Sequence, residues 1–75
     1  MPHVVVKVLP GKSEEEKSRL AEAIVRDVME CFDYGEDAVS VAIHEISQAE
    51  WARAVYEPDI VADAKHLYKT PGYQM

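Results

Sequence analysis

The sequence predicts an α+β chain in which a strand, a long helix and a second strand are followed by short helices. Three patterns predict this fold: a β-branched run at residues 3–9, an amphipathic stretch at 13–32, and an alternating stretch at 38–46. The chain has 75 residues and a mass of 8.4 kDa. This length suits one small domain, which we expect to span residues 1–75.

The first predicted strand runs from His3 to Leu9 and reads HVVVKVL. Apolar side chains occupy both of its faces, a pattern typical of a strand that is covered on both sides. The Pro10-Gly11 pair that follows favours a turn, so we expect the strand to end there.

The predicted long helix begins at Ser13, which is the expected N-cap. Glu16 lies three residues later, so the two residues have the spacing of a capping box. Apolar residues from Leu20 to Phe32 then recur every three or four positions, which predicts an amphipathic helix. The Asp33-Tyr34-Gly35 segment is expected to end the helix, with Gly35 able to take the left-handed conformation.

The second predicted strand spans Ala38 to Ile46 and alternates in side-chain character. Val39, Val41 and Ile43 share one face, whereas Ser40, Ala42 and His44 share the other. A strand, a helix and a strand in this order predict two parallel strands joined by a right-handed crossover.

The last 30 residues give a weaker signal. Residues 47–56 are interpreted as a turn or short helix with Ser47 as a possible cap. Pro58 suits the first position of a helix, and the spacing from Ile60 to Tyr68 is helical. The Lys69–Tyr73 segment, which contains Pro71 and Gly72, is typical of a tail.

Two parallel strands and one helix make an incomplete sheet. Two-stranded sheets are marginal alone, and the open edges can pair with another chain. The single cysteine, Cys31, cannot form an internal disulfide, so the chain has no covalent staple. We therefore expect a homodimer in which a second copy completes a four-stranded sheet.

Composition and charge restrict the expected partners. The chain carries 8 Lys and Arg against 14 Asp and Glu, a net charge of −6, which argues against nucleic acid and anionic membranes as ligands. No apolar run approaches the length of a membrane span, and we expect a cytoplasmic protein. Three histidines and one thiol, far apart in sequence, predict no metal site, and nothing in the sequence predicts a cofactor.

Pro2 is the first candidate for chemistry. A proline at this position permits removal of Met1, which leaves a secondary amine at the start of the first strand. Free α-amino groups titrate near about 7.7–8.0, and desolvation lowers that value, so such an amine suits a general base. The alternative is a proline with no catalytic role, which many proteins carry at position 2.

Two further residues are candidates for substrate binding. Lys12, just before the long helix, could hold a carboxylate together with free helix N–H groups, or it could be a solvated loop lysine. Trp51, the only tryptophan, could form an apolar pocket wall or pack at a subunit contact. Arg53 could supply a second cation or lie on the surface.

In combination, these residues resemble the 4-oxalocrotonate tautomerase family of the tautomerase superfamily. The resemblance covers about residues 2–51 and rests on Pro2, the valine-rich strand, the Leu9–Lys17 run (LPGKSEEEK) and the Val39–Ile43 strand. The tail, with its LYKTPGY sequence, is similar to the dimeric bacterial subgroup. The resemblance thus implies a β-α-β fold assembled as a homodimer rather than a hexamer.

The resemblance also implies an activity, keto–enol tautomerisation of small 2-oxo acids by an isomerase. Pro2 matches the general base. Lys12 and Ser40 stand where hexameric members have substrate-binding arginines, and Trp51 stands where they have phenylalanine. Because the bidentate guanidinium forks are absent, a monoacid with an apolar body, such as an arylpyruvate enol, is the expected substrate.

Two other functions remain open from the sequence. Relatives in the superfamily hydrate or dehalogenate unsaturated acids with a cationic proline as the acid, usually with several arginines. Only Arg19, Arg26 and Arg53 are present here. A non-catalytic dimeric binding module is the remaining alternative.

Overall fold

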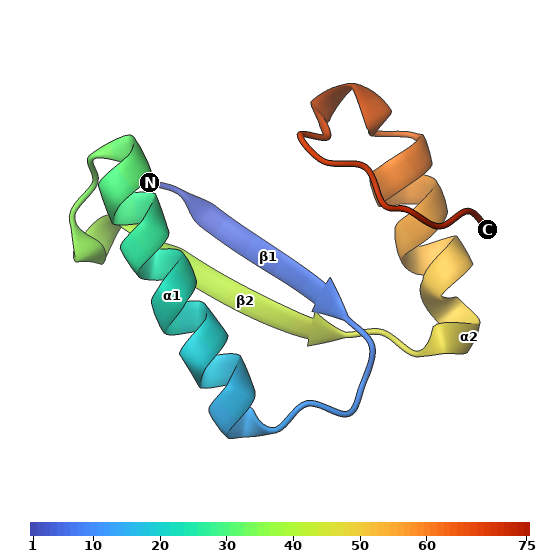
Figure 1. Ribbon diagram of the computed structural model, residues 1–75, viewed down its shortest axis with the longest axis horizontal. Helices are drawn as coiled ribbons and strands as arrows, with labels where there is room; N and C mark the ends of the chain where they lie inside the picture. Colours follow the sequence, from blue (N-terminus) through green and yellow to red (C-terminus); the bar gives the residue numbers. More distant parts are fainter. The chain divides into compact units, whose positions relative to one another are not determined.

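The computed structural model describes residues 1–75, and Figure 1 shows the order of the elements along the chain. The strands are β1 (His3–Val8) and β2 (Ser40–Glu45), and the α-helices are α1 (Glu14–Phe32) and α2 (Gln48–Trp51). The chain divides into two compact units, Met1–Glu45 and Ile46–Met75, and each is described by itself. That residues 1–75 act as a single domain stays a prediction.

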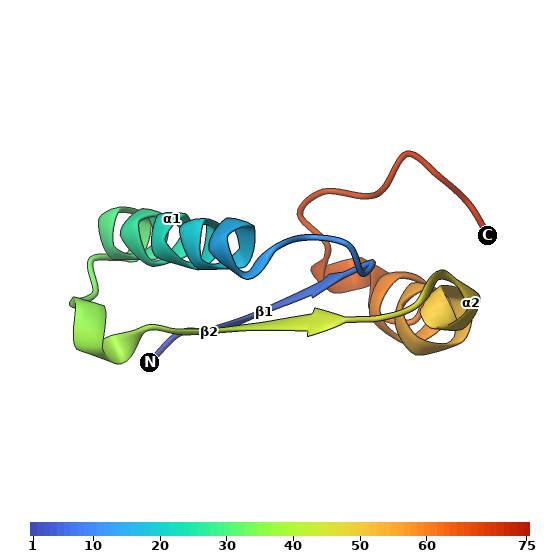
Figure 2. The ribbon, with the colours of Figure 1, turned by 90° about the horizontal axis from the view of Figure 1, so that it is seen from below.

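The first unit is a parallel β-α-β unit, as predicted. β1 and β2 pair in parallel, with His3 opposite Ser40 at one end and Val8 opposite Glu45 at the other. Helix α1 forms a second layer on one side of this sheet (Figure 2) and packs mainly over β2. On that side β1 is therefore covered less closely by the helix than β2 is.

The predicted capping box at the start of α1 is confirmed. The Glu16 backbone N–H donates to the Ser13 hydroxyl at 3.0 Å, and the Ser13 N–H donates to Glu16 Oε1 at 2.9 Å. At the other end, α1 stops at Phe32, directly before the predicted Asp33–Gly35 stop, but the expectation that Gly35 takes the left-handed conformation was wrong. Asp33 takes the left-handed conformation, with φ of 59°, whereas Gly35 has φ of −80°. Aspartate tolerates this region because its short polar side chain bonds locally.

The two sheet faces differ in exposure. Along β1 the even-numbered residues are half-buried and the odd-numbered ones are exposed. Val5, on the face opposite α1, is 46% exposed, so the expected cover on both sides of the first strand is not present in a single copy.

The second unit begins with α2, which Ser47 caps by accepting a hydrogen bond from the Glu50 N–H. A wider, π-type helix continues from Ala52 to Val61 with Pro58 inside it, so the prediction that a helix begins at Pro58 was wrong. Proline lacks the N–H that an α-helix uses at this position, and the wider turn accommodates it. Beyond Val61 only a single turn, Ala64–His66, precedes the tail.

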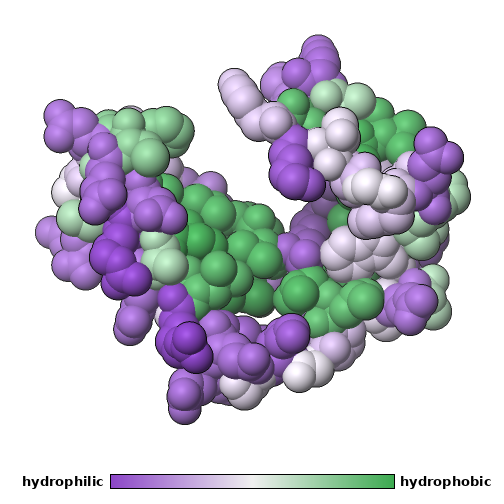
Figure 3. Space-filling view, viewed as in Figure 1, coloured by the Kyte–Doolittle hydropathy of each residue, from purple (hydrophilic) through white to green (hydrophobic).

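Very little of the chain is buried. Val55, 5% exposed, is the one buried hydrophobic side chain, and none of α1 is fully buried. Hydrophobic surface lies open beside α1, over the sheet (Figure 3). A folded domain needs a larger buried apolar area than this, so a single copy leaves apolar surface available for association. No helix is both long enough and apolar enough to span a membrane.

Candidate active site

Pro2 lies at the amino end of β1, where the sheet holds its backbone. The Ser40 N–H donates to the Pro2 carbonyl oxygen at 3.2 Å, which extends the strand pairing by one residue. This bond uses the carbonyl and leaves the Pro2 nitrogen outside the strand ladder. Met1 is 99% exposed, so the bond whose cleavage would turn that nitrogen into an amine lies at an accessible end.

Ser40 is close to Pro2 along the sheet, but its side chain has a partner of its own. The Ser40 hydroxyl lies 2.6 Å from Nδ1 of His3, the residue opposite it in the register. Both belong to the exposed face, opposite α1, whereas Pro2 is half-buried like Val4 and Val6. The sequence analysis did not predict this contact. Two parallel strands that begin near residues 3 and 40 would place these residues opposite each other, and that pairing was the available signal.

Lys12 lies at a hollow between the sheet and the first turns of α1. The hollow has a volume of about 210 Å³ and is lined mostly by apolar side chains with a few charged ones: Val6, Val8, Leu20, Ile43, Lys12, Glu16 and Lys17. An apolar cavity with a small number of charged groups is typical of a small-molecule site. We take this hollow as the candidate substrate site.

Two lysines line this hollow, but only one is neutralised. Lys17 Nζ pairs with Glu45 at 2.7 Å and with Glu14 at 3.0 Å. Hydrogen bonds to these carboxylates, first that of Glu45, raise the pKa of Lys17. Lys12 has no such ion pair, so it is the cation at this hollow that is available for a ligand carboxylate.

Glu16 also lines the hollow and is committed to the helix cap. Hydrogen bonding from the Ser13 backbone, and then from its hydroxyl, lowers the pKa of the Glu16 carboxyl, while Lys12 makes a smaller contribution of the same sign. The carboxylate is therefore held in place by the capping box, and it does not form an ion pair with Lys12.

Pro2 and Lys12 are not brought together within one copy. Pro2 precedes β1 and Lys12 follows it, and the six residues of the strand span about 20 Å at 3.3 Å per residue. Figure 1 shows the amino terminus at one end of the sheet and the loop before α1 at the other. A base and a cation so placed cannot act on the same small molecule from one chain.

Trp51 belongs to the second unit, where it is part of an aromatic cluster. Its indole Nε1–H donates to the Tyr73 hydroxyl at 2.9 Å, and the Tyr73 and Tyr56 rings lie 5.8 Å apart at a tilt of 37°. Sequence reasoning did not identify Tyr73, because nothing in the tail pattern indicates which side chain it meets. Arg53, the second possible cation, is paired with Glu50.

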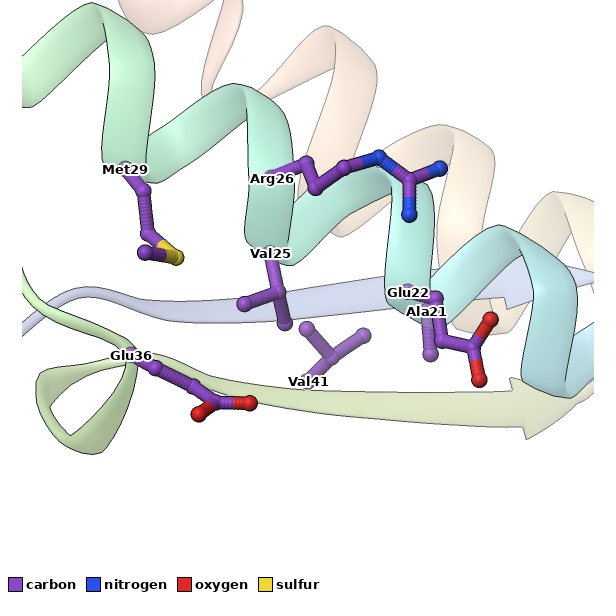
Figure 4. Close-up of a pocket in the computed structure, with 7 residues that line it drawn as sticks. All are labelled: Ala21, Glu22, Val25, Arg26, Met29, Glu36 and Val41. Atoms are coloured by element: carbon purple, nitrogen blue, oxygen red, sulfur yellow. The ribbon is translucent and has the colours of Figure 1, made fainter.

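A larger hollow of about 640 Å³ lies beside α1 and β2 (Figure 4). Val25 and Val41 point toward each other across it, whereas the Arg26 guanidinium points away from Val41. The remaining charged side chains are the carboxylates of Glu22 and Glu36, so this hollow does not suit an anionic substrate. No group of three or more His, Cys, Asp or Glu residues could hold a metal ion.

Sequence comparison finds relatives along the whole chain. A family profile described as “Tautomerase enzyme” matches residues 2–57. The chain is 37% identical over 73 residues to a “Probable tautomerase” of Xylella fastidiosa. This match covers 97% of this chain and 89% of that protein. It is 40% identical over 74 residues to “Tautomerase PptA” of Pectobacterium carotovorum, with 97% of each chain covered.

Solved structures give the same result for the fold. The structure of YwhB, described as a homologue of 4-oxalocrotonate tautomerase, matches with a TM-score of 0.66 and 33% identity, over 72% of this chain and 88% of that one. A 4-oxalocrotonate tautomerase isozyme from Methylibium petroleiphilum matches with a TM-score of 0.60 and 28% identity, over 61% and 72% of the two chains.

Proposed function

The chain belongs to the tautomerase family and is an isomerase, and we propose that it interconverts the enol and keto forms of small 2-oxo acids with Pro2 as general base. The observation that carries this proposal is the position of Pro2. The family match begins at this residue, and the Ser40 N–H binds its carbonyl while leaving its nitrogen free of the ladder. Once Met1 is removed, that nitrogen is an amine on a rigid strand.

The proposed active site is shared between two copies in a homodimer, rather than a hexamer, in the cytoplasm. When two copies of a β-α-β unit pair their sheet edges in an antiparallel manner, the start of a strand in one meets the end of a strand in the other. Lys12 of one copy then approaches Pro2 of the second. The sparse burial of the single copy supports such an association.

In this site the residues have separate roles. Lys12 binds the substrate carboxylate, and Trp51 is the proposed apolar wall. Ser40 is the proposed hydroxyl donor to the 2-oxo oxygen; within one copy its hydroxyl contacts His3 on the sheet face opposite the Lys12 hollow, so this role requires the Ser40 of a neighbouring copy. The Pro2 amine takes the proton from the enol hydroxyl, and the resulting ammonium delivers a proton to the adjacent carbon, which gives the keto acid with no net change in protons.

The proposed substrate class is a monoacid with an aromatic or apolar body. One unpaired lysine provides for one carboxylate, and the apolar lining of the hollow suits a ring better than a second acid group. Arylpyruvate enols meet both conditions.

The test is the enol-to-keto conversion of phenylpyruvate by the mature protein. Because general base catalysis contributes roughly 100-fold or more, we expect protein that retains Met1, whose Pro2 nitrogen is an amide and cannot act as a base, to have a kcat lower by at least that factor. Pro2→Ala serves as a second comparison: removal of Met1 leaves it with a primary amine in place of the secondary amine of proline, so we expect a smaller loss of activity. Equal rates for mature protein and protein that retains Met1 would refute the assigned base.

The pH dependence of kcat/KM separates this proposal from hydration or dehalogenation of unsaturated acids. A proline base gives activity that rises with pH, whereas a proline acid gives activity that falls. Mass spectrometry of the native protein addresses the non-catalytic alternative: a chain that begins at Pro2 is required for the proposed reaction.

A further inference from the structure

We propose that Tyr73, in the carboxyl-terminal tail, is a positioning residue that fixes the Trp51 indole and thereby sets the preference for substrates with an aromatic body. This inference rests on the proposed function, in which Trp51 is the wall of the site. It concerns contacts within the second unit only, all of which the structure describes.

The first step is the hydrogen bond between the two side chains. The Trp51 Nε1–H donates to the Tyr73 hydroxyl oxygen at 2.9 Å, which is near the optimum for such a bond. Indole has one donor and no acceptor, so this contact satisfies its only polar group. The rest of the indole is then presented as a purely apolar surface.

The second step is the support of Tyr73 itself. Its ring lies against Tyr56, with centroids 5.8 Å apart, in the tilted arrangement that aromatic pairs favour. Tyr56 lies on the same continuous helical segment as Trp51, so the tail ring bridges two points of one rigid element. Tyr73 therefore restricts rotation of the indole from a position 22 residues away in sequence.

The third step connects the orientation of the indole to specificity. An aromatic wall favours an aromatic substrate only when the rings meet in an offset or tilted geometry, and such a pair contributes roughly a three- to tenfold preference. An indole that rotates freely loses this geometry while it still excludes water. We expect loss of Tyr73 to reduce selectivity more than it reduces the rate of proton transfer.

The experiment compares three variants with the wild type. Tyr73→Phe keeps the ring and removes the hydroxyl, and Tyr73→Ala removes both. Tyr68→Phe is the matched control, because Tyr68 lies in the same tail and its side chain is fully exposed. One readout is acrylamide quenching of Trp51, which is the only tryptophan. The other is the ratio of kcat/KM for the enols of phenylpyruvate and of an aliphatic 2-oxo acid.

We expect both Tyr73 variants to increase quenching and to lower the kcat/KM ratio about threefold or more, mainly through KM for phenylpyruvate, while Tyr68→Phe changes neither. Unchanged quenching in both variants would refute the contact, and changed quenching with an unchanged ratio would refute its role in specificity. Wild-type protein that converts neither enol would refute the proposed function and this role with it, whereas the quenching result would still report on the contact.

Discussion

The two ends of the β-α-β unit differ in chemistry and in what holds them. At one end the Ser40 N–H holds the Pro2 carbonyl, and the His3 and Ser40 side chains meet on the exposed sheet face. At the other end the capping box fixes the start of α1, beside a hollow where Lys12 is the unpaired cation. In the proposed function one end holds the base and the other holds the carboxylate-binding group, so a single copy would supply two half-sites.

Mixing two inactive variants gives the largest expected effect and tests this division directly. Protein that retains Met1 lacks the base and Lys12→Ala lacks the cation, so each homodimer should have little activity. Random exchange makes half of the dimers mixed, and each mixed dimer has one of its two sites intact. We therefore expect recovery of about a quarter of wild-type activity after unfolding and refolding the mixture.

The same mixture distinguishes the alternative arrangement. If Pro2 and Lys12 of one chain acted together, no mixed dimer would contain a complete site and no activity would return. Refolded wild type provides the reference for losses during the procedure.

Substitution of Lys12 tests whether the end that carries it acts in substrate binding rather than in proton transfer. Lys12→Gln should raise KM for phenylpyruvate enol roughly tenfold with little change in kcat, because a charged hydrogen bond to the carboxylate acts on bound substrate and transition state alike. Lys12→Arg should restore binding. The exposed Lys65, substituted as Lys65→Gln, is the matched control. A loss confined to kcat would contradict the binding role.

The sequence predicted local features better than it predicted contacts between residues that are distant in the chain. Ser13 and Glu16 form their capping box because both partners lie within one helical turn, and β2 forms within the predicted 38–46 stretch, although Ala42 is half-buried like Val41 and Ile43. The sequence did not predict that Asp33 rather than Gly35 would take the left-handed conformation or that Pro58 would lie inside a helix, since wider or left-handed turns depend on local energies that residue type alone does not settle.

The candidate site shows the same limit. Pro2, Lys12 and Trp51 were identified by residue type and position, but the separation of Pro2 from Lys12 became evident only from the path of β1. The contacts of His3 with Ser40 and of Tyr73 with Trp51 join residues 37 and 22 positions apart. Such contacts depend on the register of the sheet and on the path of the tail.

A smaller expected effect concerns the contribution of each end of the β-α-β unit to the free energy of unfolding. Ser13→Ala removes the helix cap and should lower the free energy of unfolding by about 1 kcal/mol. Ser40→Ala removes one exposed side-chain hydrogen bond and leaves the backbone bond to Pro2, so we expect a loss of about 0.5 kcal/mol. Urea denaturation measures both. An equal or larger loss from Ser40→Ala would show that the His3 contact stabilises the Pro2 end more than its exposure suggests.

The smallest expected effect is a sensitivity to acid at the Lys12 end. Because hydrogen bonds from Ser13 lower the pKa of Glu16 below its ordinary value of 4.5, the charged carboxylate favours the folded state. This contribution is complete above pH 4.5 and is lost as the pH falls through the lowered value. Glu16→Gln keeps an acceptor for the Ser13 N–H but does not titrate, so its stability should change less between pH 6 and pH 3.

Glu15→Gln is the control for this acid effect, since Glu15 lies in the same turn and does not bond to Ser13. Both variants lose one negative charge, so a general effect of net charge would alter their pH dependence equally. An acid response reduced only in Glu16→Gln would assign it to the cap. Because Glu16 lines the same hollow as Lys12, protonation of the cap would then loosen the carboxylate-binding end, while the backbone bond that holds Pro2 contains no titrating group.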